Sequence, residues 1–201
     1  MQVLVSFLLF IVLSMPGFGQ QGDAAFVKKL QDHYKTVKSI TANFTQRKQS
    51  MLFDEPLLSK GLFYYQSPDK IRWEQQEPTA TYLVINKDEI IQFDGESIKK
   101  STGLTMQMSI FRQFILGTVD GSILKDEAFK KSFSSKNGKM FITLVPVDKR
   151  MAKRLHKVEL MFDEKTMVLD HLKMFENSAD FTEINFTEQQ LNTTVPSSIF
   201  Q

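Results

Sequence analysis

The 201-residue sequence contains no cysteine, one tryptophan and three histidines. Without cysteine the chain has no disulfide, no thiolate metal ligand, no cysteine nucleophile and no N-terminal cysteine to carry a lipid anchor after processing. The sequence signatures of α/β-hydrolases, P-loop enzymes, dinucleotide-binding proteins and zinc proteases are also absent. The sequence therefore gives no sign of an enzyme from these classes.

A strong net charge is absent as well. Twenty-five basic residues against 23 acidic ones give a formal charge of +2, which is too small to predict nucleic acid or an anionic membrane as the main partner. One basic run stands out, Lys-Arg-Met-Ala-Lys-Arg at residues 149–154. It is typical of a solvated loop or short helix, and the alternative is a docking patch for an acidic partner or for lipid head groups.

The residues with the chemistry for catalysis or metal binding are few and scattered. His156 and His171 lie in predicted strands, but no further ligands occur at a spacing suited to a metal site. The acidic pairs at 54–55 and 126–127 lie beside proline or at predicted helix starts, where acidic side chains commonly cap helices. We therefore expect neither a metal centre nor a cofactor.

What is abundant is phenylalanine and methionine. The chain has 18 Phe against 4 Tyr, and 10 Met. Both side chains bury apolar area without a polar tip, and Met adapts to irregular shapes. Two interpretations stay open: a large ordinary core, or a core that is lined to receive an apolar ligand.

The N-terminus has an apolar run of eleven residues, 3–13, followed by Pro16 and by Gly17-Phe18-Gly19. The run is short for a transmembrane helix, which needs about 20 residues. It fits the hydrophobic region of a signal peptide with a small-residue cleavage site, although no basic residue precedes it. We predict a signal peptide over 1–19 and a single domain over 20–201.

The remaining chain predicts one sheet with a few helices. Apolar residues at helical spacing predict a helix over 23–39 with Asp23 as its N-cap. Alternating apolar residues, bounded by turn residues, predict strands that begin near residue 40 and form an antiparallel meander. The predicted strands cover 57–66, 70–76, 81–85, 89–93, 129–135, 139–147, 155–162, 167–176 and 181–187.

Two helices are predicted between the two groups of strands. Residues 104–116 (LTMQMSIFRQFIL) form an apolar segment that we expect to be a helix closed by Gly117. Residues 122–129 predict a second short helix. Asn137-Gly138 predicts a tight hairpin turn. The order of these elements indicates a mainly β (α+β) fold.

A set of short motifs gives the chain a family resemblance. In order they are Phe-Thr-Gln at 44–46, the Ser-x-Gly-aromatic strand at 59–63, Ser-Pro-Asp-Lys-Ile-Arg-Trp-Glu at 67–74, Glu-Pro at 77–78 and Phe-Thr-Glu-Ile at 181–184. Their order and spacing resemble the LolA family of periplasmic lipoprotein carriers over nearly the whole predicted mature chain.

The resemblance implies a fold and a function. The fold is a curled antiparallel sheet that forms an incomplete β-barrel, with helices as a lid over an apolar concave face. The function is non-enzymatic: a monomeric periplasmic carrier takes an acylated lipoprotein from an inner-membrane transporter and delivers it to an outer-membrane receptor. Acyl chains suit an apolar cavity because each buried methylene contributes about 0.8 kcal/mol.

By position, the resemblance assigns cavity or lid contacts to Ile71, Trp73, Leu83 and Ile85. Strand alternation predicts that Leu83 and Ile85 share one face, and that Ile71 and Trp73 do the same. The lid is assigned to the helical segment with Met106, Met108, Phe111, Phe114 and Ile115. The alternative for the four strand residues is that they are ordinary core.

The sequence departs from the family at the proposed latch. Where well-studied members place an arginine that tethers the lid, this chain has Ser67, which has no charge and cannot form a charge-assisted, multi-donor bond. Arg72 follows beside Trp73 as a second candidate for a contact at this turn. The latch is therefore expected to be weaker or to be formed by other residues.

The cargo and the activity leave alternatives. Glu-Pro-Leu-x-Ser-x-Gly at 55–61 resembles a divergent branch of LolA-like proteins found with pigment or polyene lipid pathways, so a glycolipid or a lipid-linked pigment is a second candidate cargo. A lipid-modifying enzyme and a sensor or scaffold on the same fold are the remaining alternatives.

Overall fold

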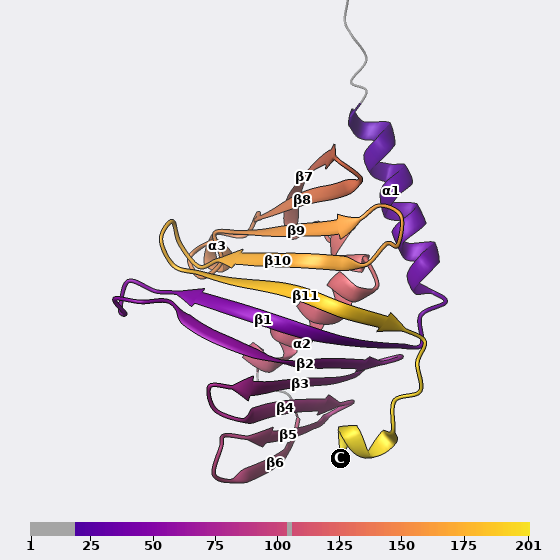
Figure 1. The fold of residues 1–201 in the computed structure, drawn as a ribbon. Coiled ribbons are helices and arrows are strands. Elements are labelled where there is room, and N and C mark those ends of the chain that lie inside the picture. The colour runs from indigo at the N-terminus through magenta and orange to yellow at the C-terminus, as the bar shows by residue number, and fades with distance from the viewer. Residues whose placement is uncertain (1–18, 104–105) are drawn as a thin grey trace, which may run out of the picture.

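The computed structural model describes residues 19–103 and 106–201, with side chains described from residue 23 onward except those of 104–111 and 113. Eleven strands form one antiparallel sheet in the order β6-β5-β4-β3-β2-β1-β11-β10-β9-β8-β7 (Figure 1). The first and last strands of the chain meet in the middle of this sheet, where β1 pairs with β11. The sheet curls but does not close on itself, so the predicted incomplete barrel is confirmed.

The strands of the first half are β1 (Ser39–Gln49), β2 (Leu57–Gln66), β3 (Lys70–Glu77), β4 (Thr81–Asn86), β5 (Glu89–Phe93) and β6 (Ile98–Thr102). Those of the second half are β7 (Phe129–Lys136), β8 (Lys139–Pro146), β9 (Lys157–Asp163), β10 (Leu169–Phe175) and β11 (Phe181–Leu191). The helices are α1 (Gly19–Tyr34), α2 (Met106–Val119) and α3 (Lys149–Ala152), with 3₁₀ turns η1 (Ser122–Leu124) and η2 (Ser197–Phe200).

The strands form where side chains alternate between a buried and an exposed face. In β9 every second residue is buried, and β8 repeats the pattern. Asn137 and Gly138 join β7 to β8 with positive φ angles of 54° and 73°, as a two-residue hairpin turn requires.

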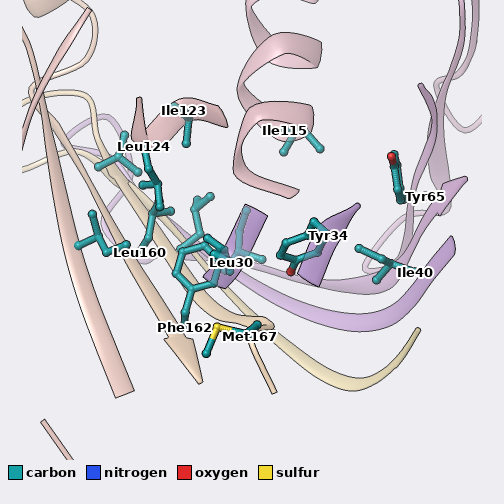
Figure 2. Packing of buried hydrophobic residues seen from close by; sticks show 14 of the residues in the cluster. Leu30, Tyr34, Ile40, Tyr65, Ile115, Ile123, Leu124, Leu160, Phe162 and Met167 are labelled. Atoms are coloured by element: carbon teal, nitrogen blue, oxygen red, sulfur yellow. The ribbon is translucent and has the colours of Figure 1, made fainter. Parts of the chain in front are cut away.

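The two long helices lie on the concave side of the sheet. One face of α1 buries Phe26, Leu30 and Tyr34 against the second half of the sheet, where the rings of Phe26 and Phe162 meet edge to face at 6.0 Å. Helix α2 crosses behind the central strands, and η1 follows it (Figure 1). Figure 2 shows Leu30 and Tyr34 of α1 beneath Ile115 of α2, with the strands curving around them.

A smaller cluster lies on the opposite face. Val84 and Ile91 pack there against Val195 and Phe200 of the C-terminal segment. The last residues thus cover the convex side of β3 to β5, while the cavity side is left to α1 and α2.

Several predicted boundaries were wrong. Helix α1 ends at Tyr34 instead of residue 39, and α2 continues through Gly117 to Val119. The predicted helix at 122–129 is limited to the three residues of η1, and strand β6 was not predicted. The predicted signal peptide falls almost entirely on residues 1–18, which lie outside the described residues, and stays a prediction. Among the described helices, none has the length and apolar character needed to cross a bilayer.

Candidate functional site

An apolar cavity lies between α2 and the concave face of the sheet. Its walls come from both helices and from strands of both halves: Tyr34, Ile40, Phe63, Trp73, Ile115, Thr118, Val119, Leu169, Leu172, Ile184, Phe186 and Gln189. None of these side chains carries a charge at neutral pH. The cavity volume is about 40 Å³, far below the roughly 300–1,000 Å³ of ordinary ligand pockets. The described state is therefore closed.

One part of the cavity wall is an aromatic cluster around the single tryptophan. The Trp73 ring lies 4.4 Å from Phe44, 5.7 Å from Phe63 and 6.2 Å from Phe186, measured between centroids. Phe63 is paired with Trp73 across β2 and β3, and Trp73 with Leu83 across β3 and β4. This pairing stacks large apolar side chains across neighbouring strands on the concave face.

The structure brings four of the predicted residues onto that face. Ile71 pairs with Ile85 as Trp73 pairs with Leu83. Ile71 and Ile85 are completely buried in the main core, whereas Leu83 is partly buried and packs against it. Of these four only Trp73 lines the cavity. The other three support the wall from behind or beside it.

On the lid side, Ile115 lines the cavity and Phe114 packs against the core. The backbone of Met106, Met108 and Phe111 belongs to α2, but their side chains lie outside the described residues. Their assignment to the lid contact stays a prediction.

Ser67 and Arg72 contact parts of the molecule other than α2 in the described structure. The Ser67 backbone N–H donates to the Lys38 carbonyl at 2.8 Å, which joins the end of β2 to the start of β1. Arg72 is on the convex face: its Nε donates to Glu74 at 2.7 Å and its Nη1 to the Ile199 carbonyl at 3.2 Å. Its guanidinium also stacks 4.0 Å from the centroid of Tyr82.

The contact between α2 and the turn that holds Ser67 is made by a residue that sequence reasoning missed. Arg112 of α2 donates from Nη2 to Oδ2 of Asp69 at 3.1 Å, and both side chains are three-quarters buried. Arg112 is the only charged residue between positions 104 and 116, and Asp69 is the only acid of the β2–β3 turn. These two isolated opposite charges were the sequence signal that could have predicted the ion pair.

The polar groups of the cavity wall are satisfied within the protein. The Thr118 hydroxyl donates to the Phe114 carbonyl at 2.8 Å, and the Gln189 amide donates to the Leu169 carbonyl at 2.9 Å. Burial raises the pKa of Tyr34 above its usual range, so its phenol stays neutral. The wall therefore offers a ligand apolar contact and few directional hydrogen bonds.

The histidines form no catalytic group with one another. His171 Nε2 lies 2.9 Å from Glu183 Oε1. In the sheet, His171 of β10 pairs with Met161 of β9. His156 precedes β9 and donates its backbone N–H to the Phe175 carbonyl, at the other end of β10. Among the described residues, no three acidic or histidine side chains converge in a way that would hold a metal ion.

A half-barrel whose helix covers an uncharged cavity defines a class of proteins built to enclose apolar ligands. Residues 35–201 match the family described as outer membrane lipoprotein carrier protein LolA, and the chain belongs to this family. An outer-membrane lipoprotein carrier protein of Pseudoalteromonas translucida is 24% identical over 94% of this chain and 86% of its own length. One of Methylococcus capsulatus is 22% identical over 97% and 91%.

Solved structures share the fold at low identity. A chain of the Pseudomonas aeruginosa MucA/MucB complex superposes with a TM-score of 0.56 at 12% identity, over 90% of this chain and 60% of that chain. A structure of MucB gives 0.53 at 15% identity, over 91% and 63%. The chain thus spans less than two thirds of these structures, and the likeness shows the fold alone.

Proposed function

We propose that the protein is a periplasmic carrier that holds the acyl chains of lipoproteins between the sheet and α2, without covalent chemistry. The observation that carries this proposal is the uncharged cavity, whose wall is drawn from both halves of the sheet and both long helices. In this role it would receive cargo from an inner-membrane transporter and deliver it to an outer-membrane receptor. Membership of the LolA family and the two relatives named as lipoprotein carriers support the same function.

The closed cavity explains how such a carrier stays soluble when empty. Burial of an acyl chain contributes about 0.8 kcal/mol for each methylene. A cavity of about 40 Å³ holds only a small part of an acyl chain. Helix α2 must therefore move away from the sheet as cargo enters. The lining that cargo would contact is then the aromatic cluster around Trp73 together with the inner face of α2.

The experiment uses Trp73, the only tryptophan in the chain, as an internal probe. A triacylated peptide is titrated into the protein and Trp73 emission is recorded, with the same peptide lacking acyl chains as the control ligand. We expect saturable change with the acylated peptide alone. Unchanged emission, together with an apolar dye that is not displaced by acylated peptide, would overturn the proposal.

A variant pair locates the binding site. Ile115→Asn places an amide in the cavity wall, where burial of an unpaired polar group costs about 1–3 kcal/mol, so affinity should fall about tenfold. Ile98→Asn changes an exposed isoleucine on β6 and should leave affinity unchanged. Circular dichroism establishes that both variants fold. Equal affinity in the two variants would place the ligand outside the cavity.

The cargo class is tested separately, because an apolar wall recognises acyl chains and not the group attached to them. Mass spectrometry of lipid extracted from protein purified from its native host should show a lipoprotein N-terminus. Recovery of a glycolipid or a lipid-linked pigment would instead support the second cargo, with the same cavity and the same lid movement.

A further inference from the structure

The largest exposed apolar group in the described structure is at the tip of the β1–β2 hairpin. Met51 and Leu52 are 76% and 87% exposed, and Phe53, Leu57 and Leu58 are each at least half exposed. The tip, residues 50–58, projects past the ends of its neighbouring strands (Figure 1). Folding leaves these side chains in water although each is costly there, and contiguous exposed apolar groups mark interaction sites.

The tip is held in place by the rest of the sheet. The Met51 backbone N–H donates to Oδ1 of Asp180 in the β10–β11 turn at 2.7 Å. The Leu52 N–H donates to the Ser50 hydroxyl oxygen at 3.3 Å, and the Phe53 N–H donates to the Ser50 carbonyl at 3.2 Å. The apolar side chains are thus presented by an ordered loop.

The basic run 149–154 lies at the same end of the sheet. It leads directly into β9, whose first residue Lys157 pairs with Phe175, the last residue of β10. Phe175 in turn pairs with Phe181 of β11, which pairs with Gln49 at the end of β1. With strands about 4.8 Å apart, the run and the hairpin tip are separated by only two intervening strands.

The cations of this run face solvent. Lys149, Arg150, Lys153 and Arg154 are exposed. Asp148 caps α3 by accepting from the Arg150 and Met151 backbone N–H groups, and its ion pair with Arg150 is long, at 3.7 Å. Among the described residues the other three cations have no acidic partner within 4.0 Å. Within the run and its N-cap, four positive charges therefore stand against one acid, Asp148.

We infer that this end of the sheet docks on a lipid bilayer that contains anionic lipids. The apolar tip enters the boundary between head groups and acyl chains, and the basic run contacts the head groups. A convex apolar projection fits a fluid bilayer, which needs no matching groove, and interfacial binding grows with buried apolar area and with electrostatic attraction. The inference goes beyond the carrier function and does not require the cavity to bind a ligand.

The test is sedimentation of the full chain with vesicles of phosphatidylcholine alone or of phosphatidylcholine with phosphatidylglycerol. We expect binding to the second kind at low salt, which weakens as salt is added. Leu52→Asn with Phe53→Asn should abolish it, whereas Phe141→Asn, which changes an exposed phenylalanine near the opposite turn, should not. Equal binding of the tip variant and wild type would overturn the inference, as would wild type that ignores both vesicles.

A second pair of variants tests the basic run. Lys153→Gln with Arg154→Gln should weaken binding about fivefold for each charge removed. Lys136→Gln with Lys165→Gln removes two exposed charges from turns at the other end of the strands and should have little effect. If both pairs weaken binding equally, the run has no special role and that part of the inference is wrong.

Binding of the acylated peptide, followed by Trp73 emission, is measured on the same variants. Loss of vesicle binding with retained peptide binding supports docking apart from the cavity. Loss of both together would overturn it, because the substitutions would then have disturbed the cavity as well.

Discussion

At the scale of single residues, Gly61 shows why the Ser-x-Gly-aromatic strand has its glycine. A Cβ at this position would lie 1.9 Å from the Glu74 carbonyl oxygen and 2.8 Å from Cζ of Phe44. The first of these atoms is backbone of the neighbouring strand, which cannot rotate aside. The missing side chain therefore lets β2 and β3 pair while Phe44 packs over them toward the aromatic wall of the cavity.

Gly61→Ala should accordingly destabilise the protein by about 1–3 kcal/mol or more, the cost of overpacking a filled core. The free energy of unfolding is measured by urea denaturation. Ser59→Ala is the matched control in the same strand, since the Ser59 hydroxyl is buried without a hydrogen-bond partner among the described residues, and its loss should cost little. Equal stability of Gly61→Ala and wild type would contradict the packing argument.

Glu183 links stability to pH through the charged side chains around it. Its hydrogen bond with His171, followed by the nearby Lys173 and Arg47, holds the pKa of the Glu183 carboxyl below its usual value. A lowered pKa stabilises the folded state above the ordinary pKa, and this contribution is lost as pH falls through the folded-state value.

Glu183→Gln should therefore flatten the fall in stability below about pH 4, where unperturbed glutamates take up protons. Thermal unfolding followed from neutral to acid pH gives the comparison. Glu176→Gln changes an exposed glutamate in the β10–β11 turn and should retain the wild-type pH dependence. If the stability of Glu183→Gln and of wild type falls identically at acid pH, the charges around Glu183 do not contribute to the pH dependence.

At the scale of elements, the strands were predictable because turns and alternation are local properties. Strands β2 and β5 were predicted at their observed bounds, because turn residues flank both. In β2 buried positions also recur with period two, whereas β5 buries the adjacent residues Ile90 and Ile91. Strand β6 was not predicted because all five of its residues are exposed. It has one apolar side chain and follows the sheet only by backbone pairing with β5, which leaves no pattern to detect.

The helices show where local rules give way to packing. Gly117 was expected to end α2, but it lies inside the helix, where a Cβ would be 3.3 Å from Cβ of Ile123. It permits a close approach of η1, and the left-handed glycine comes later, at Gly121. Similarly, Trp73 and Ile115 were predictable as apolar and inward, but their shared cavity depends on contacts between distant segments.

An ion pair between Arg112 of α2 and Asp69 links this helix to the β2–β3 turn. Each side chain is about a quarter exposed, so solvent screens the pair and about 1 kcal/mol is a fair expectation for it. Asp69→Asn and Arg112→Gln should each raise the rate of amide hydrogen exchange in α2 about fivefold, since that energy corresponds to a fivefold change in an equilibrium.

Two control variants test whether the faster exchange in α2 comes from loss of the Arg112–Asp69 ion pair. Asp94→Asn removes an aspartate that pairs with Lys99 in the β5–β6 turn, and Arg72→Gln disturbs the convex face without touching α2. Both should leave exchange in α2 unchanged. In the double variant of Asp69 and Arg112 the effects should not add, because the second substitution finds no pair left to break. Additive effects would show that the two residues act separately.

At the scale of the whole molecule, the closed cavity and the proposed cargo together require two states. A cavity of about 40 Å³ is too small for an acyl chain, so cargo needs an open state, and the affinity for cargo is reduced by the fraction of protein that is open. A substitution that weakens the closed state should therefore strengthen binding. Asp69→Asn should bind the triacylated peptide more tightly than wild type, by about the same factor of five that its α2 exchange rate rises.

Hydrogen exchange with bound peptide then distinguishes opening from binding elsewhere. The amides of α2 around Ile115 should lose protection when cargo fills the space beneath them. The amides of β1 and β11, which pair with each other in the middle of the sheet, should stay protected. The peptide without acyl chains should change neither. If α2 keeps its protection while acylated peptide is bound, the ligand is not beneath the helix, and the lid movement on which the carrier function depends does not occur.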